Sequence, residues 1–197
     1  MTNTPARRPF VFLDRDGTLV HDAGYTHRVD DYRLLEGVKP GLKRLVAAGY
    51  ALAIVTNQSG IGRGYYGEAD YLRFQRHLEA DLLAAGIPIV ASLHCPHLPD
   101  AGCGCRKPEP GMLDRARREF GADLARSFVI GDGPGDLGLA ARAGLRGAVL
   151  VLTGLGEATS QETPPSVPRA ADLVAAARVI EGLPAPDAPS PRPLVRR

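Results

Sequence analysis

Two aspartates two residues apart, Asp14 and Asp16, stand in the segment D-R-D-G-T directly after a short apolar run. On a chain that is leaving a strand, both carboxylates can reach one point beyond the sheet edge, and Gly17 permits a tight turn that brings backbone amides toward a ligand. One carboxylate could act as a nucleophile while a hard cation neutralises its charge and that of the substrate. An ordinary acidic loop is the competing interpretation of this segment alone.

Three more segments with polar groups follow apolar runs. Thr56 opens T-N-Q-S-G, whose hydroxyls and exposed amides suit phosphate oxygens, although an ordinary turn is the simpler interpretation. Lys107, one of only three lysines, stands just before an expected helix and could neutralise a phosphoryl group. Asp132 and Asp136 follow another apolar run, where capping of a helix is the alternative role for Asp136.

The cysteines form a separate cluster with one histidine, C-P-H followed by C-G-C. Three thiols and an imidazole at this spacing are typical of a closed, tetrahedral zinc site, formed here by Cys95, His97, Cys103 and Cys105. A surface thiol cluster or an incidental disulfide are the alternatives, and the odd number of cysteines disfavours a disulfide framework. The loop has little core of its own, so zinc would be its main source of order.

Alternating strands and helices must position these groups, which predicts an α/β fold with a parallel sheet flanked by helices. Apolar runs and their boundaries predict strands at Phe10–Leu13, Tyr50–Val55, Ile87–Leu93, Ser127–Ile130 and Ala148–Leu152. Helices are expected from about Pro40 to Gly49 and at Glu68–Ala85, Gly111–Phe120 and Asp136–Ala143. The polar segment Gly156–Arg169 is expected to be a loop, and Asp172–Ile180 a last strand-and-helix element.

The composition of the 197 residues predicts one domain over residues 8–183, with the zinc loop at 95–105, and a disordered, proline-rich tail at 184–197. A net charge of +2 is too balanced to favour nucleic acid or a membrane surface as a partner. The apolar runs are too short to cross a membrane, and the N-terminus lacks the apolar stretch of a secretory signal. We therefore expect a cytoplasmic protein, and a monomer.

In their order along the chain, the four strand-end segments resemble the motifs of the haloacid dehalogenase-like phosphohydrolases over roughly residues 8–155. The resemblance implies a Rossmann-like sheet. The cysteine loop, followed by R-K-P, resembles the subgroup of heptose bisphosphate phosphatases and histidinol-phosphate phosphatases, which have no large cap domain. The segments D-A-G-Y-T-H, T-N-Q-S-G-I-G-R-G and R-K-P-E-P-G-M are more similar to the heptose enzymes.

Two features depart from that pattern: only five residues separate His97 from Cys103, and Gly133 stands where the family usually has lysine. The short loop is nearer to the histidinol-phosphate type. The glycine leaves Lys107 as the main lysine expected near the phosphate.

The resemblance implies the following chemistry. Asp14 attacks phosphorus and forms an aspartyl-phosphate, while Asp16 protonates the leaving oxygen and then activates water. Mg²⁺ is held by Asp14, the backbone carbonyl of Asp16, and Asp132. Thr56 and Lys107 stabilise the phosphoryl oxygens.

Asp136 is expected to orient the metal ligands. The residues expected to line the substrate are Asp22, Gly24, Tyr25, Asn57, Gln58, Ser59 and Arg106. The implied reaction is Mg²⁺-dependent hydrolysis of the 7-phosphate of a phosphorylated sugar, D-glycero-D-manno-heptose 1,7-bisphosphate, in the synthesis of nucleotide-activated heptose for lipopolysaccharide or surface glycans.

Three alternatives stay open. Histidinol phosphate could be the substrate of the same machinery. A phosphatase of polynucleotide ends is disfavoured by the near-neutral charge and the lack of an aromatic platform. A zinc-stabilised interaction module with a dead phosphatase site is disfavoured by the intact residues Asp14, Asp16, Thr56, Lys107 and Asp132.

Overall fold

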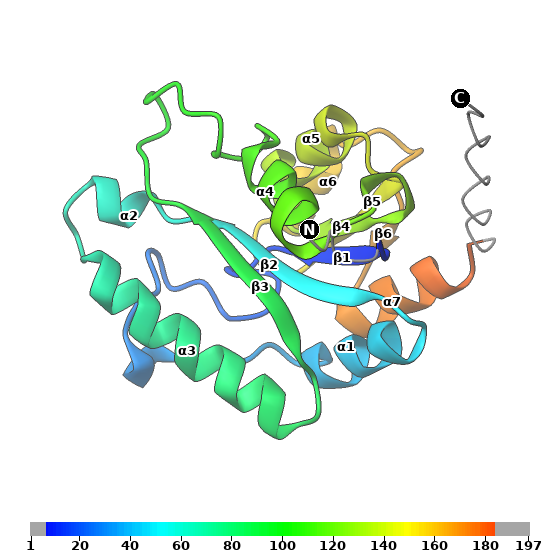
Figure 1. Ribbon diagram of the computed structural model, residues 1–197, viewed down its shortest axis with the longest axis horizontal. Coiled ribbons are helices and arrows are strands. Elements are labelled where there is room, and N and C mark those ends of the chain that lie inside the picture. The colour runs from blue at the N-terminus through cyan, green and yellow to red at the C-terminus, as the bar shows by residue number, and fades with distance from the viewer. Residues whose placement is uncertain (1–6, 184–197) are drawn as a thin grey trace, which may run out of the picture.

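In the computed structural model, which describes residues 7–183, six parallel strands form one sheet in the order β3-β2-β1-β4-β5-β6 (Figure 1). The predicted tail at 184–197 lies outside the described residues. The strands are β1 Phe10–Leu13, β2 Ala51–Asn57, β3 Ile89–Cys95, β4 Phe128–Gly131, β5 Gly147–Val151 and β6 Arg169–Ala170. The predicted α/β class with a parallel sheet is confirmed.

Helices cover both faces of the sheet. One face carries α1 (Val38–Ala47), α3 (Glu68–Ala84) and α7 (Leu173–Glu181), and the other carries α4 (Gly111–Phe120) and α5 (Pro134–Ala143). The alternation of side chains along a strand explains the two layers. In β1, Val11 and Leu13 pack into the core of the first face, whereas Phe10 and Phe12 pack into the second.

The segment Gly156–Arg169, predicted as a loop, contains a helix, α6 (Gly156–Glu162), and that prediction is wrong. Its residues are mostly polar, and only the first is buried, so no apolar periodicity marks the helix in the sequence. The last strand, β6, also comes before Asp172 and not after it. Three single-turn helices had no prediction: η1 Val29–Asp31, α2 Ser59–Gly62 and η2 Leu124–Arg126.

The order of the strands reverses between β1 and β4, which are neighbours in the sheet. The backbone N–H of Asp14, just after β1, donates to the carbonyl of Ile130 in β4 at 2.9 Å. In doubly wound sheets, ligands bind outside the carboxyl ends of the strands at such a reversal. Across residues 7–183, no helix combines the length and apolarity needed to cross a membrane.

Candidate active site

At the centre of the site, the ammonium group of Lys107 joins two carboxylates. Its Nζ lies 2.7 Å from Oδ1 of Asp14 and 2.7 Å from Oδ1 of Asp136. Lys107 and Asp136 are buried, and the side chain of Asp14 is 14% exposed. Burial disfavours the charged lysine, but the two carboxylates outweigh it and raise the pKa of Lys107, which stays protonated. Asp14 is the partly open member of the three.

Asp132 completes an acidic cluster whose carboxylate oxygens, together with those of Asp14 and Asp136, lie within 4.8 Å of one another. Burial, and then the neighbouring charge of Asp14, raises the pKa of Asp132 to about 7. Burial likewise raises the pKa of Asp136 to about 6, against the lowering effect of Lys107. Hard oxygen donors that repel one another in this way suit Mg²⁺, because a divalent cation relieves the repulsion.

The second predicted aspartate, Asp16, is held by two side chains. Arg15 contacts both carboxylate oxygens at 2.9–3.1 Å, and the amide of Gln58 donates to Oδ2 at 2.7 Å. Burial raises the pKa of Asp16, although the Arg15 charge opposes this shift. Gln58, expected to line the substrate, is 3% exposed. Its side chain forms hydrogen bonds with Arg15, Asp16, Thr56 and Tyr66.

Asn57 and Thr56 are the last residues of β2, and this strand places them beside the loop that carries Lys107. The side chain of Asn57 accepts from the backbone N–H of Lys107 at 3.0 Å and donates to its carbonyl at 3.2 Å. Thr56 is buried, with its hydroxyl accepting from Gln58 at 2.8 Å. Asn57 therefore fixes the backbone at the predicted phosphate-binding lysine.

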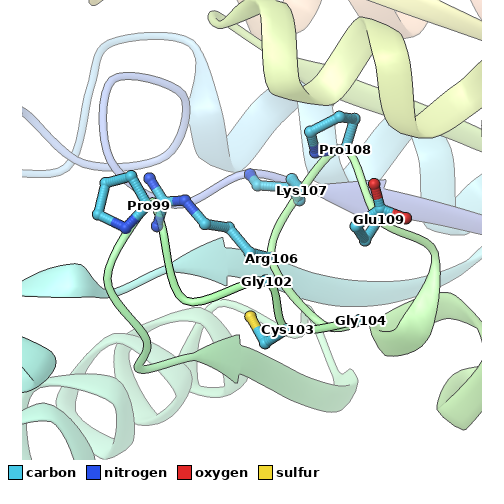
Figure 2. A pocket seen from close by; sticks show the side chains of 8 residues that line it. All are labelled: Pro99, Gly102, Cys103, Gly104, Arg106, Lys107, Pro108 and Glu109. Carbon is cyan, nitrogen blue, oxygen red and sulfur yellow. The ribbon is translucent and has the colours of Figure 1, made fainter.

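Two cavities flank this centre. The first, of about 330 Å³, is lined by Arg106 and Lys107, among others (Figure 2). Lys107 also contacts Asp14. The second, of about 270 Å³, is lined by Asp22 together with Asp132. Two of the predicted substrate-binding residues, Arg106 and Asp22, thus each line a cavity together with a residue of the central cluster.

Three other predicted substrate-binding residues, Gly24, Tyr25 and Ser59, do not line either of these two cavities. Gly24 and Tyr25 both have left-handed backbones, with φ of 84° and 56°. Tyr25 is exposed, and its ring meets that of Tyr65 edge to face at 4.9 Å. Ser59 begins the short helix α2.

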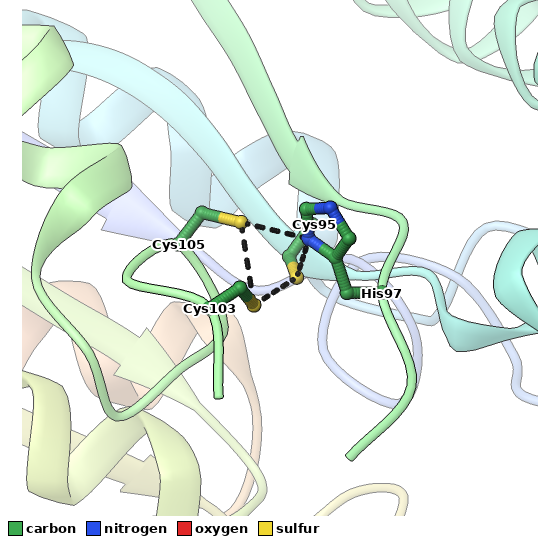
Figure 3. Close-up of side chains that lie close together, drawn as sticks. All are labelled: Cys95, His97, Cys103 and Cys105. Atoms are coloured by element: carbon green, nitrogen blue, oxygen red, sulfur yellow. Dashed lines mark hydrogen bonds between the residues drawn. The ribbon is translucent and has the colours of Figure 1, made fainter. Parts of the chain in front are cut away.

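The cysteine loop brings its four predicted ligands together (Figure 3). The Sγ of Cys103 lies 3.5 Å from that of Cys95 and 3.6 Å from that of Cys105, and Nδ1 of His97 lies 3.3 Å and 3.5 Å from Cys105 and Cys95. In a tetrahedral zinc site the ligand atoms are about 3.5–3.8 Å apart, given the usual Zn–S and Zn–N lengths. The three thiols are free, so the donor set fits zinc. The neighbouring histidine, His94, is not one of these four and pairs with Glu68 at 2.6 Å.

The sequence assigned no role to Arg15, which the structure shows as the largest fully buried side chain. In the sequence, only its position between the two candidate catalytic aspartates could have indicated a role for Arg15. Leu155 and Thr18 were also missed: the backbone N–H of Leu155 donates to Oδ2 of Asp132 at 2.8 Å, and the hydroxyl of Thr18 lies 3.5 Å from Oδ1.

Comparison with known proteins adds to this geometry. A family model described as HAD-hydrolase-like matches residues 104–177, which include Lys107, Asp132 and Asp136. Two proteins of Photorhabdus laumondii are similar: a D-glycero-beta-D-manno-heptose-1,7-bisphosphate 7-phosphatase, 44% identical over 74% of this chain and 81% of the relative, and the corresponding alpha enzyme, 38% identical over 78% and 86%.

Among solved structures, the D,D-heptose 1,7-bisphosphate phosphatase of B. bronchiseptica, crystallised with magnesium and phosphate, has a TM-score of 0.81 and 34% identity. That match covers 88% of this chain and 98% of the other. The relatives and the solved structure thus match about three quarters or more of this chain and are not confined to one motif.

Proposed function

Since the chain belongs to the haloacid dehalogenase-like phosphatases, we propose that it hydrolyses the 7-phosphate of D-glycero-D-manno-heptose 1,7-bisphosphate. The observation that carries the proposal is the buried ion-pair cluster in which Lys107 joins Asp14 to Asp136 beside Asp132. The sugar is inferred from relatives at 44% and 38% identity, whose names specify this substrate in its beta and alpha forms.

Asp14 is the proposed nucleophile because its carboxylate is the most open of the acidic cluster and already lies against a fixed cation. Its oxygen attacks phosphorus, and the phosphoryl group passes from the substrate oxygen to Asp14. Asp16 donates a proton to the leaving oxygen and takes one from the water that later cleaves the aspartyl-phosphate. Lys107 and Thr56 stabilise the charge of the phosphoryl oxygens.

Two metal ions fit the proposal. Asp14, Asp132 and the backbone carbonyl of Asp16 would hold Mg²⁺, which would supply charge neutralisation for the phosphoryl group. Asp136 is proposed to orient the metal ligands and, through its ion pair, Lys107. Zn²⁺ would be held by the four ligands of the cysteine loop and would serve structure, because all four positions of the tetrahedron are filled by the protein.

The far end of the substrate is assigned to the residues around the two cavities. Arg106 is the proposed partner of the second phosphate, since a guanidinium can grip a phosphate through paired hydrogen bonds. Asp22, on the other cavity, can accept hydrogen bonds from sugar hydroxyls. Gly24, Tyr25, Asn57 and Ser59 are proposed to shape the remainder of this surface.

The test is phosphate release by the purified protein with Mg²⁺, measured with both anomers of the heptose bisphosphate and with histidinol phosphate. We expect the highest kcat/KM with one of the heptose anomers. Asp14→Asn should abolish turnover and preserve the fold, whereas Asp30→Asn, at an exposed side chain, should leave both turnover and fold unchanged. A higher kcat/KM with histidinol phosphate would contradict the substrate. A kcat above a tenth of wild type in Asp14→Asn would contradict the covalent mechanism.

A further inference from the structure

Arg15 stands between the two aspartates of the first loop, but its side chain turns into the protein. It is 0% exposed, and its guanidinium carbon lies 4.7 Å from the ring centre of Phe74 and 5.6 Å from that of Tyr71, both on α3. A charge buried this deeply is costly unless it is paired, so its partners determine its role.

The main partner of Arg15 is the Asp16 carboxylate. Nε lies 3.1 Å from each carboxylate oxygen, and Nη2 donates to Oδ1 at 2.9 Å. From the other side, the amide of Gln58 donates to Oδ2 at 2.7 Å. The carboxylate is therefore gripped by two buried groups that come from the ends of β1 and β2.

Gln58 is itself held in one orientation. Its Oε1 accepts from Arg15 at 3.1 Å and from the hydroxyl of Tyr66 at 2.6 Å, so its NH₂ must face Asp16. Nη2 of Arg15 also donates to the carbonyl of Thr26 at 2.7 Å. This hydrogen bond connects the segment 22–27, which contains the predicted substrate-binding residues Asp22, Gly24 and Tyr25, to the same network.

This network is not the arrangement that stability alone would favour. Nη1 of Arg15 has no hydrogen-bond partner within residues 7–183, and a buried ion pair is often no more stabilising than apolar side chains of the same volume. Its clearest effect is to fix the direction of one carboxylate. A proton donor displaced by about 1 Å can cost about a hundredfold in rate.

We propose that Arg15 is a positioning residue that aims the Asp16 carboxyl group at the leaving oxygen of the substrate, with Gln58 and Tyr66 as its supports. The inference rests on the proposed phosphatase function. In the first step, the bond between phosphorus and the leaving oxygen breaks, phosphorus bonds to Asp14, and the Asp16 proton moves to the leaving oxygen. Arg15 keeps its own protons throughout.

The experiment compares p-nitrophenyl phosphate with phenyl phosphate. The two substrates have the same core and a single phosphate, but phenol is the poorer leaving group and needs protonation more. The constant kcat/KM covers only the steps up to departure of the phenol, so the later hydrolysis of the aspartyl-phosphate does not enter it.

We expect Arg15→Lys, which keeps the charge but loses the planar fork, to lower kcat/KM for phenyl phosphate about ten- to hundredfold. This is part of the usual contribution of general acid catalysis. The value for p-nitrophenyl phosphate should fall less than about threefold. Tyr66→Phe removes only the hydroxyl that orients Gln58, and should show the same selective loss at a smaller size, so the test survives if Arg15→Lys does not fold.

Arg169→Lys is the matched control. The guanidinium of Arg169 also donates several hydrogen bonds, to the hydroxyl of Ser160 and to backbone carbonyls within residues 160–167, but none to the residues of the active site. Arg169→Lys should change kcat/KM for the two substrates by the same factor, or leave both values unchanged. An equal loss with both substrates in folded Arg15→Lys and Tyr66→Phe, or no loss in either, would overturn the inference. If the wild-type protein hydrolyses neither compound nor the heptose bisphosphate, the proposed function fails instead.

Discussion

Gly17 and Gly154 approach each other backbone to backbone beside the Asp132 carboxylate. A methyl group at position 154 would lie 2.6 Å from the Cα of Gly17 and 2.1 Å from Oδ2 of Asp132. Both glycines have positive φ, of 78° and 56°. The hydroxyl of Thr153 also donates to the carbonyl of Gly17 at 2.6 Å. The loop after β5 thus fits closely around the aspartate proposed to bind Mg²⁺.

Gly154→Ala should therefore weaken Mg²⁺ binding. The added methyl group cannot displace the Gly17 backbone, so it must shift Asp132, and misplaced supports of metal ligands typically cost ten- to hundredfold in affinity, which is about the loss expected here. Calorimetric titration with Mg²⁺, alongside the Mg²⁺ dependence of phosphate release, measures the effect.

Gly144→Ala is the control, since Gly144 has a similar φ of 65° but open space around it. It carries the same backbone strain, and should lower the melting temperature without changing Mg²⁺ affinity. Equal Mg²⁺ affinities in the two variants would show that the close approach of the two glycines has no effect on the metal site.

Lys107→Met should destabilise the fold and also lower the activity. The substitution leaves Asp14 and Asp136 without the buried cation between them, and breaking a buried ion pair costs about 3–5 kcal/mol. For a domain of this size that lowers Tm by about 6–20 °C. Calorimetry without Mg²⁺ should record this shift, and kcat/KM should fall about a hundred- to a thousandfold.

The control is Lys39→Met, which breaks a partly exposed pair with Asp81 that is worth about 1 kcal/mol or less. If Lys107→Met lowered Tm no more than Lys39→Met, the cluster would not be held together by the buried lysine.

One zinc ion per chain is expected in the native protein. His97→Asn and Cys103→Ser should each release it, because either change removes one of four ligands, while His94→Asn should retain it. Elemental analysis after purification without chelators gives the ratio. Activity should fall with zinc content, since Cys105 directly precedes Arg106. Native protein free of zinc would rule out the site.

Arg106→Ala should lower activity toward the bisphosphate but not toward a substrate with a single phosphate. Loss of a charged, paired hydrogen bond to the far phosphate is worth about 1.5–3 kcal/mol, which corresponds to about ten- to a hundredfold in kcat/KM for the bisphosphate. Turnover of p-nitrophenyl phosphate, which has no far phosphate, should stay within about twofold. Arg115→Ala, at an exposed arginine on α4, should affect neither substrate. A loss shared by both substrates would place Arg106 in the chemical step.

The elements with strong local signals were predicted well. β1 and α4 begin and end where the sequence predicted, because an apolar run bounded by Pro9 and Asp14, and a helix closed by the left-handed Gly121, are local features. The residues of the acidic cluster were predicted because Asp14 and Asp132 directly follow buried strands and Asp136 lies at the start of the next helix, and parallel strands bring their carboxyl ends together.

The features that were missed depend on contacts between distant segments. Nothing near Arg15 in the sequence indicates that α3 will supply the rings of Tyr71 and Phe74 that cover it, and arginine is normally exposed. The burial of Gln58 beside Asp16 could not be predicted for the same reason, and its expected contact with the substrate stays a prediction.

The position of β1 between β2 and β4 also determines when, during synthesis, this protein can first become active. Asp14 leaves the ribosome before Asp132 and Asp136, because these two follow β4, which comes after β2, α3, β3 and α4. Contacts between segments so far apart in the chain close slowly and late in folding. A nascent chain that ends before β4 therefore carries the proposed nucleophile without Asp132, the proposed Mg²⁺ ligand, and should release no phosphate.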